Sequence, residues 1–173
     1  MEYLVYFYVY SFLGWCLEVV YQGLKKGRFI NRGFLLGPWC PIYGIGASFI
    51  IERSKDFNST LEVFIMTLFV ASFIELIAGI LLNLIFHQRW WDYSEYPLNI
   101  GGYICPLFSI AWGICGVLVV KIIHPPIDIF YEYIPDLLLY ILLLTISLFF
   151  IADLVLTVLN LLKINHHIKK IDK

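Results

Sequence analysis

The feature that most constrains this chain is a series of apolar segments, each long enough to cross a lipid bilayer as a helix. A hydrocarbon core about 30 Å thick needs about 20 helical residues, and irregular backbone cannot face lipid because its amides would lack partners. Alternation at the strand period is absent. The chain therefore predicts an all-α, polytopic membrane protein with one transmembrane domain over residues 1–173. Its five predicted helices cover about 3–23, 34–51, 61–86, 100–120 and 134–162.

The composition agrees with a membrane protein and excludes other classes. Hydrophobic residues make up 61% of the chain and charged residues 14%, whereas a soluble domain has about 25% charged residues. The balance of 12 Lys+Arg against 13 Asp+Glu provides no large cationic surface for a nucleic acid. The lipid bilayer is the expected partner.

Basic residues in the short connections predict the orientation of the helices. If the N-terminus lies outside, nine basic residues fall on the inner side and three on the outer side, as the positive-inside rule requires. The inner ones are Lys25, Lys26, Arg28, Arg32, Arg89, Lys163, Lys169, Lys170 and Lys173, and the outer ones are Arg53, Lys55 and Lys121. We therefore expect an N-out, C-in arrangement in which residues 163–173 form a basic cytoplasmic tail. Aromatic anchors at the outer interface would be Tyr3, Tyr6, Tyr8, Tyr131 and Tyr133.

A short pattern occurs twice and suggests a repeat of two hairpins. The stretches from Asn31 to Pro38 and from Asn99 to Pro106 share an Asn, a Gly two residues later, an aliphatic residue five later and a Pro seven later. Because proline removes an amide donor and glycine loosens the backbone, the second and fourth helices should have broken starts. Broken helices at matching positions indicate a transporter's substrate site. Close packing of helices through small residues explains the glycines equally well.

Three carboxylates, Glu18, Glu75 and Asp153, interrupt the first, third and fifth apolar segments. An ionised carboxylate at the centre of a membrane helix costs about 2.5 to 3.5 kcal/mol, so each needs polar surroundings. Other polar residues share their helix faces, and such stripes must face one another or water. We therefore predict an acidic intramembrane cavity. The residues expected to line it are Glu18, Glu75, Asp153, Asn31, Arg32, Asn99, Asn83 and Trp15.

Three interpretations of these charges stay open. In the first, they line the path of an ion or small polar solute, Arg32 neutralises the empty site, and loop residues Trp91, Asp92 and Tyr93 form a gate. In the second, Arg32 pairs with the carboxylates in a non-transporting membrane subunit or scaffold, where buried ion pairs fix helix register, and the loop is an interfacial anchor. The third is an intramembrane enzyme that acts on a lipid with a carboxylate as general acid or base.

Motifs for other chemistry are missing from the sequence. It contains no Gly-x-x-x-x-Gly-Lys-[Ser/Thr] P-loop, no His-Glu-x-x-His zinc helix and no Gly-x-Ser-x-Gly elbow. The dipeptides Cys40-Pro41 and Cys105-Pro106 lack the spacing and the additional ligands of a metal site. We expect no resident metal or cofactor, and no ATPase activity in this chain itself.

Several motifs resemble a bacterial membrane-protein family, the CmpB-like family of ABC-transporter type IV proteins. They are Phe12-Leu13-Gly14-Trp15-Cys16-Leu17-Glu18, Asn31 to Pro38, Pro41-Ile42-Tyr43-Gly44, Trp91-Asp92-Tyr93-Ser94, Asn99 to Gly102 and Trp112-Gly113. The resemblance covers roughly residues 5 to 125. It implies a small multi-pass permease of the bacterial cytoplasmic membrane that works with a separate ATPase subunit and assembles from two or more copies.

Overall fold

The structure, a computed structural model, describes the backbone of residues 1–31 and 33–171 and the side chains of these residues through 164. Arg32, predicted to neutralise the site, lies outside the described residues. The described part contains helices and no strands. The helices are α1 (Glu2–Lys26), α2 (Pro41–Ser54), α3 (Thr60–Phe86), α4 (Pro106–Leu118), the π-helix η1 (Val119–Ile123), α5 (His124–Glu132) and α6 (Asp136–Ile171).

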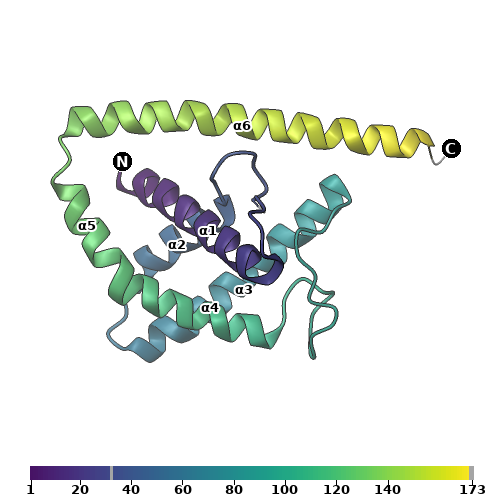
Figure 1. Cartoon of the computed structure of the whole chain (residues 1–173). Coiled ribbons are helices and arrows are strands. Elements are labelled where there is room, and N and C mark those ends of the chain that lie inside the picture. Colours follow the sequence, from purple (N-terminus) through teal and green to yellow (C-terminus); the bar gives the residue numbers. More distant parts are fainter. Residues whose placement is uncertain (32, 172–173) are drawn as a thin grey trace.

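Four helical runs in the described part are long and apolar enough to cross a membrane: α1, α3, the continuous run α4-η1-α5, and α6. This confirms the predicted all-α, multi-pass class. The second predicted segment differs, because α2 has only 14 residues and the chain from 33 to 40 is not helical. Figure 1 shows α1, α2, α3, the α4–α5 run and α6 following one another in alternate directions. The N-out orientation stays a prediction.

Both interrupted helices begin at a proline that follows a cysteine. Cys40 is the N-cap of α2 and Pro41 its first residue, and Cys105 and Pro106 take the same places in α4. Proline suits this position because its missing N–H would have no helical partner and its φ is preset. The helix breaks thus fall within or directly after the two matching stretches from which they were predicted.

Glycines bring the helices of each hairpin into close contact. A Cβ added at Gly44 would lie 2.2 Å from Ser11 Oγ, where α2 crosses α1. A Cβ added at Gly116 would lie 2.1 Å from Thr67 Cγ2, where α4 crosses α3. Small residues allow membrane helices to approach each other in this way. The packing interpretation therefore holds for these two glycines.

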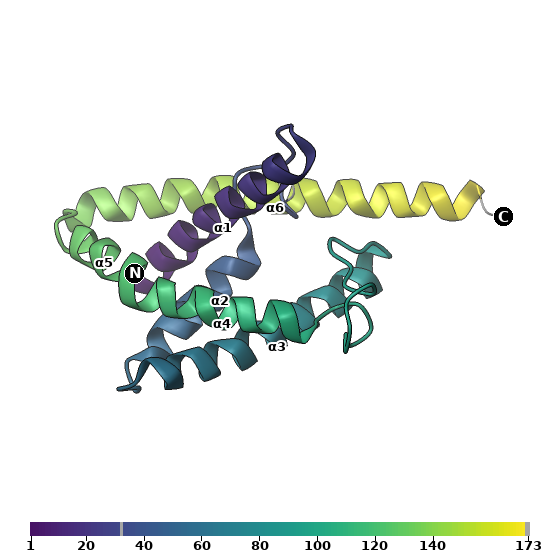
Figure 2. The ribbon, with the colours of Figure 1, turned by 60° about the horizontal axis from the view of Figure 1, so that its bottom comes forward.

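The last helix, α6, meets α1 through a few side chains around Tyr8 and then continues past the rest of the molecule. Leu139 and Leu143 form a buried cluster with Tyr8, whose hydroxyl donates to Ser147 Oγ at 2.8 Å. With 36 residues at 1.5 Å each, α6 is about 54 Å long, well above the thickness of a hydrocarbon core. Its C-terminal part projects beyond the bundle (Figures 1 and 2). The predicted basic tail thus continues α6 as helix through Ile171.

Two of the tyrosines predicted as interface anchors lie inside the protein instead. Tyr6 is 2% exposed and Tyr8 is 8% exposed. The hydroxyl of Tyr6 donates to Asp128 on α5, and its ring meets His124 edge-on at 4.7 Å. These rings are buried because their hydroxyls find partners within the bundle. Tyr3 and Tyr133 are exposed, as expected for anchors.

Candidate functional site

Glu75 is buried between α3, α4 and the 87–105 loop, with only 6% of its surface exposed. Its Oε1 accepts a hydrogen bond from the Tyr93 hydroxyl at 2.8 Å, and its Oε2 accepts one from the Trp112 indole N–H at 3.1 Å. Tyr93 belongs to the loop and Trp112 to α4. Within the described part of the chain, no Lys or Arg forms an ion pair with Glu75. Neutral donors therefore hold this carboxyl group.

Glu18 lies on α1 and accepts a hydrogen bond from the Tyr43 hydroxyl of α2 at 2.7 Å. The Tyr43 ring lies 5.7 Å from the Trp112 ring, so the donor that binds Glu18 contacts a donor that binds Glu75. Tyr43 and Trp112 thus connect the two carboxyls. We call Glu18, Tyr43, Glu75, Tyr93 and Trp112 the carboxyl centre.

Glycine makes room for the tyrosine in each hairpin. A Cβ at Gly14, one turn before Glu18, would lie 2.3 Å from Tyr43 Cγ. In the second hairpin, a Cβ at Gly79 would lie 2.7 Å from Tyr103 Cδ1, and the Tyr103 hydroxyl accepts a hydrogen bond from Asn83 at 3.0 Å. In both hairpins a tyrosine lies against a glycine and forms a hydrogen bond with the residue four positions after that glycine. These residues are Glu18 in the first hairpin and Asn83 in the second. The first tyrosine lies within α2, whereas the second lies before α4.

Asp153 has a different set of partners from the other two carboxyls. Its Oδ1 accepts hydrogen bonds from the Leu36 N–H at 3.0 Å and the Thr157 hydroxyl at 3.1 Å, and its Oδ2 accepts the Gly37 N–H at 2.7 Å. Within the described residues, these partners lie on the 33–40 loop and on α6 itself. Asp153 therefore fixes this loop to α6. Its donors are not the ones that hold Glu75.

Asn31 shapes the non-helical loop that precedes α2. Its Oδ1 accepts the Trp15 indole N–H at 2.9 Å and the Gly33 N–H at 3.2 Å, and its Nδ2 donates to the Leu36 carbonyl at 2.7 Å. Non-helical backbone in a membrane protein needs such partners because lipid offers none. Asn31 and Trp15 thus hold the loop to α1.

Asn99 has a similar role before α4. Its Oδ1 accepts the Gly102 N–H at 2.9 Å, and its Nδ2 donates to the carbonyls of Tyr96 at 2.9 Å and Ser94 at 3.2 Å. Gly102 has a positive φ of 76°, which glycine adopts without strain. In both stretches, the asparagine that the sequence pattern singled out binds loop backbone.

The three gate candidates differ in what they contact. The Trp91 indole N–H donates to the Tyr103 carbonyl at 2.9 Å, which ties the loop to the segment before α4. Tyr93 reaches inward to Glu75 and stacks on Phe108 with ring centroids 4.4 Å apart. Asp92 is exposed and accepts the Ser94 N–H at 2.9 Å. The loop thus connects the carboxyl centre to the protein surface, and its opening as a gate stays a prediction.

The Asp92 carboxyl should titrate below its ordinary pKa. Hydrogen bonds from the Ser94 hydroxyl and amide lower the pKa of Asp92 from 3.8, with a smaller contribution from the charge of Arg89. Because the folded pKa is depressed, the contact stabilises the loop above pH 3.8 and is lost as the pH falls through the lower folded value. In a carboxyl-carbon NMR titration, the Asp92 signal, assigned by its absence in Asp92→Asn, should have its midpoint below pH 3.8. A midpoint at or above the ordinary value would contradict it.

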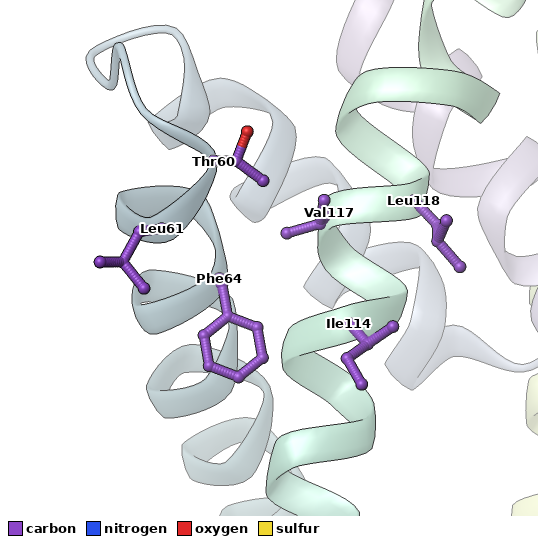
Figure 3. A pocket seen from close by; sticks show the side chains of 6 residues that line it. All are labelled: Thr60, Leu61, Phe64, Ile114, Val117 and Leu118. Atoms are coloured by element: carbon purple, nitrogen blue, oxygen red, sulfur yellow. The ribbon is translucent and has the colours of Figure 1, made fainter.

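An apolar groove of about 390 Å³ lies between α3 and α4. In Figure 3, Thr60 and Phe64 of α3 lie on the side that faces α4, and Val117 of α4 points toward them. The lining also includes Leu61, Ile114 and Leu118. The groove lies about three turns of α3 from Glu75. Its lining carries no charge and suits a lipid acyl chain. It is therefore not the acidic cavity that the sequence predicts.

Sequence reasoning picked out the carboxyls of the centre but missed two of their partners, Tyr43 and Trp112. Both residues stand in motifs quoted for the family resemblance, which was the available signal. Their positions within apolar segments gave no indication that a hydroxyl or an indole N–H would point at a carboxyl. A search for buried aromatic donors that could reach Glu18 and Glu75 was the missing step.

Membrane-spanning helices with carboxyl groups buried between them define a multi-pass membrane protein of transporter-like organisation. A family model described as "Putative ABC-transporter type IV" matches residues 5–158, and the chain belongs to this family. The match extends past the motifs quoted above into α6. No curated protein and no solved structure matches the chain.

Proposed function

We propose that this chain is the membrane-spanning permease subunit of an ABC-type transporter in the bacterial cytoplasmic membrane. The carboxyl centre lies on the path of the transported ion or small polar solute. The observation that carries the proposal is Glu75, an intramembrane carboxyl group that only neutral donors hold within the described part of the chain.

Carboxyl groups inside the membrane are costly and usually mark substrate or ion paths. In a scaffold held together by buried ion pairs, a cation would match the Glu75 carboxylate, because removing either partner of such a pair leaves an uncompensated charge. Tyr93 and Trp112 each donate one hydrogen bond to Glu75, and neither carries a positive charge. A passing cation or polar donor therefore replaces them, and movement of the loop that carries Tyr93 opens the way to Glu75.

The energy for transport comes from a separate ATPase subunit in this proposal, because the sequence has no P-loop of its own. Four candidate spans in the described residues are few for a complete permease. Two or more copies of the chain therefore assemble around the ATPase subunits.

A non-transporting membrane scaffold is the second candidate, and Asp153 is the observation that favours it. Both of its oxygens bind backbone amides of the 33–40 loop, which is what a purely structural contact requires. If the carboxyl centre has the same purpose, Glu75 contributes to stability alone. The two candidates thus differ in the effect of a substitution that preserves size at Glu75.

The Glu75→Gln variant separates them. The tagged chain is purified with any ATPase that accompanies it and reconstituted into vesicles loaded with dyes for H⁺, Na⁺ and K⁺. We expect Glu75→Gln to lower the ATP-dependent flux at least about tenfold, equivalent to about 1.4 kcal/mol in the barrier. The thermal midpoint in detergent should change little, because glutamine keeps the shape, its amide oxygen can accept the Trp112 N–H, and its amide N–H can donate to the Tyr93 oxygen.

Glu95→Gln is the matched control, because Glu95 is an exposed glutamate of the 87–105 loop and should leave flux unchanged. Undiminished flux through Glu75→Gln would remove Glu75 from the path. A lower midpoint with undiminished flux would favour a structural role for the carboxyl centre.

A further inference from the structure

Two adjacent backbone amides on the 33–40 loop form an anion-binding nest. The N–H groups of Leu36 and Gly37 donate to the Asp153 carboxylate at 3.0 and 2.7 Å. Successive amides that point at one anion make a concavity of the kind that binds phosphate and carboxylate groups in many proteins. In this structure the carboxylate comes from the protein itself. We call these two N–H groups the loop nest.

The loop nest is shaped by residues other than its occupant. Asn31 accepts the Gly33 N–H and donates to the Leu36 carbonyl, which fixes the chain that leads into the nest. A Cβ at Gly37 would lie 3.0 Å from the Asp153 oxygen and 2.7 Å from Trp39 Nε1, so only glycine leaves room for an oxyanion this close to the backbone. The Leu36 side chain is 63% exposed, so one rim of the nest is accessible.

Asp153, which occupies the loop nest, lies on α6, the helix that extends furthest from the bundle. Thr157, one turn beyond Asp153, is buried, and the side chains from 158 to 164 are half-buried or exposed. Beyond this turn α6 continues past the other helices (Figure 1). If this part of α6 moves outward, the Leu36 and Gly37 amides lose their acceptor. Because lipid offers no acceptor to a free backbone amide, another acceptor must then take the place of Asp153.

We propose that the loop nest is an oxyanion-binding site that takes the carboxylate or phosphate group of a ligand in exchange for Asp153. Two oxygens of the ligand accept the N–H groups of Leu36 and Gly37, as the Asp153 carboxylate does in this structure. The site is distinct from the carboxyl centre, and its anion binding does not depend on transport past Glu75.

The amide of Gly37 reports on the nest directly. In a full-length chain labelled with ¹³C at the leucine carbonyls and ¹⁵N at glycine, only Gly14 and Gly37 follow a leucine and give a coupled signal. Gly14 lies in α1 against Tyr43 and serves as the internal control. The chain is studied in nanodiscs of zwitterionic lipid, with sodium acetate and sodium phosphate as probes and sodium chloride as the ionic-strength control.

We expect Asp153→Ala to shift the Gly37 signal, and acetate or phosphate to return it saturably toward its wild-type position while Gly14 stays in place. The wild-type chain should need at least about tenfold more acetate, because its own carboxylate competes at high effective concentration. Thr145→Val, on α6 but outside the contacts of Asp153, should behave as wild type. Asp153→Asn, which keeps the side-chain volume, replaces the alanine variant if that variant does not fold.

Nanodiscs that contain phosphatidylglycerol distinguish a lipid phosphate from a free anion. If the Gly37 signal of Asp153→Ala lies at the wild-type position in these discs without added probe, the lipid headgroup is the source. If it moves only with dissolved anion, the ligand is soluble. The proposal is overturned if Gly37 responds to acetate, phosphate and anionic lipid no more than it responds to chloride. It is also overturned if the Gly37 signal is unshifted in both Asp153 variants.

Discussion

Replacing Gly44 with alanine should lower the free energy of unfolding by about 3 kcal/mol, because overpacking a tight contact typically costs 1 to 3 kcal/mol and occasionally more. The added Cβ would lie 2.2 Å from Ser11 Oγ and 2.5 Å from the backbone oxygen of Phe7. The serine hydroxyl can rotate, but the backbone oxygen belongs to α1 and cannot move alone. The helices of the first hairpin must therefore separate.

Gly46→Ala is the matched control, since it makes the same chemical change one half-turn further along α2. Its Cβ would meet nothing closer than Ile74 Cδ1 at 3.8 Å. Alanine also has a higher helix propensity than glycine by about 1 kcal/mol, so this variant should be as stable as the wild type or more stable. Unfolding in mixed detergent with increasing SDS measures both. Equal stabilities of the two variants would show that α1 and α2 do not cross at Gly44.

The long helices could be predicted from the sequence because uniform apolar runs leave few alternatives in a bilayer. The segment predicted at 61–86 became α3, Thr60–Phe86, and the one predicted at 3–23 became α1, Glu2–Lys26. The break before α2 was also predictable, since Pro41 cannot continue a helix from the preceding turn. What the apolar pattern hid was the length of non-helical chain before it. Its amides depend on Asp153, more than 100 residues away, and no local signal identifies such a partner.

In the candidate site, too, some residues could be predicted from the sequence and others could not. A carboxylate in an apolar run is visible in any sequence, so Glu18 and Glu75 could be named in advance. Their neighbours Tyr43 and Trp112 look like ordinary apolar aromatics until the fold turns a hydroxyl or an indole N–H toward a carboxyl. Tyr6 misled in the opposite way. Its place near a helix end indicated an interfacial anchor, whereas tertiary contact with Asp128 buries it.

Tyr93→Phe should destabilise the protein by about 2 kcal/mol, because it leaves one oxygen of the buried Glu75 carboxyl without a donor. The ring and its stacking on Phe108 are kept, so the loss isolates the hydroxyl. Tyr96→Phe is the matched control: Tyr96 lies in the same loop with its ring 6.0 Å from Tyr93, and its hydroxyl makes no hydrogen bond within the described part of the chain. It should change stability by less than about 0.5 kcal/mol.

A double-mutant cycle with Glu75→Leu tests whether the effect passes through the carboxyl. Glu75→Leu alone leaves the Tyr93 hydroxyl and the Trp112 indole N–H unpaired, so it should also destabilise. The pair Tyr93→Phe and Glu75→Leu removes a donor together with its acceptor, and such a joint loss is often nearly neutral. We therefore expect the double variant to lose about 1 to 3 kcal/mol less than the sum of the single losses. Additive losses would mean that Tyr93 stabilises the loop without binding Glu75, and the loop would then have no direct hold on the carboxyl centre.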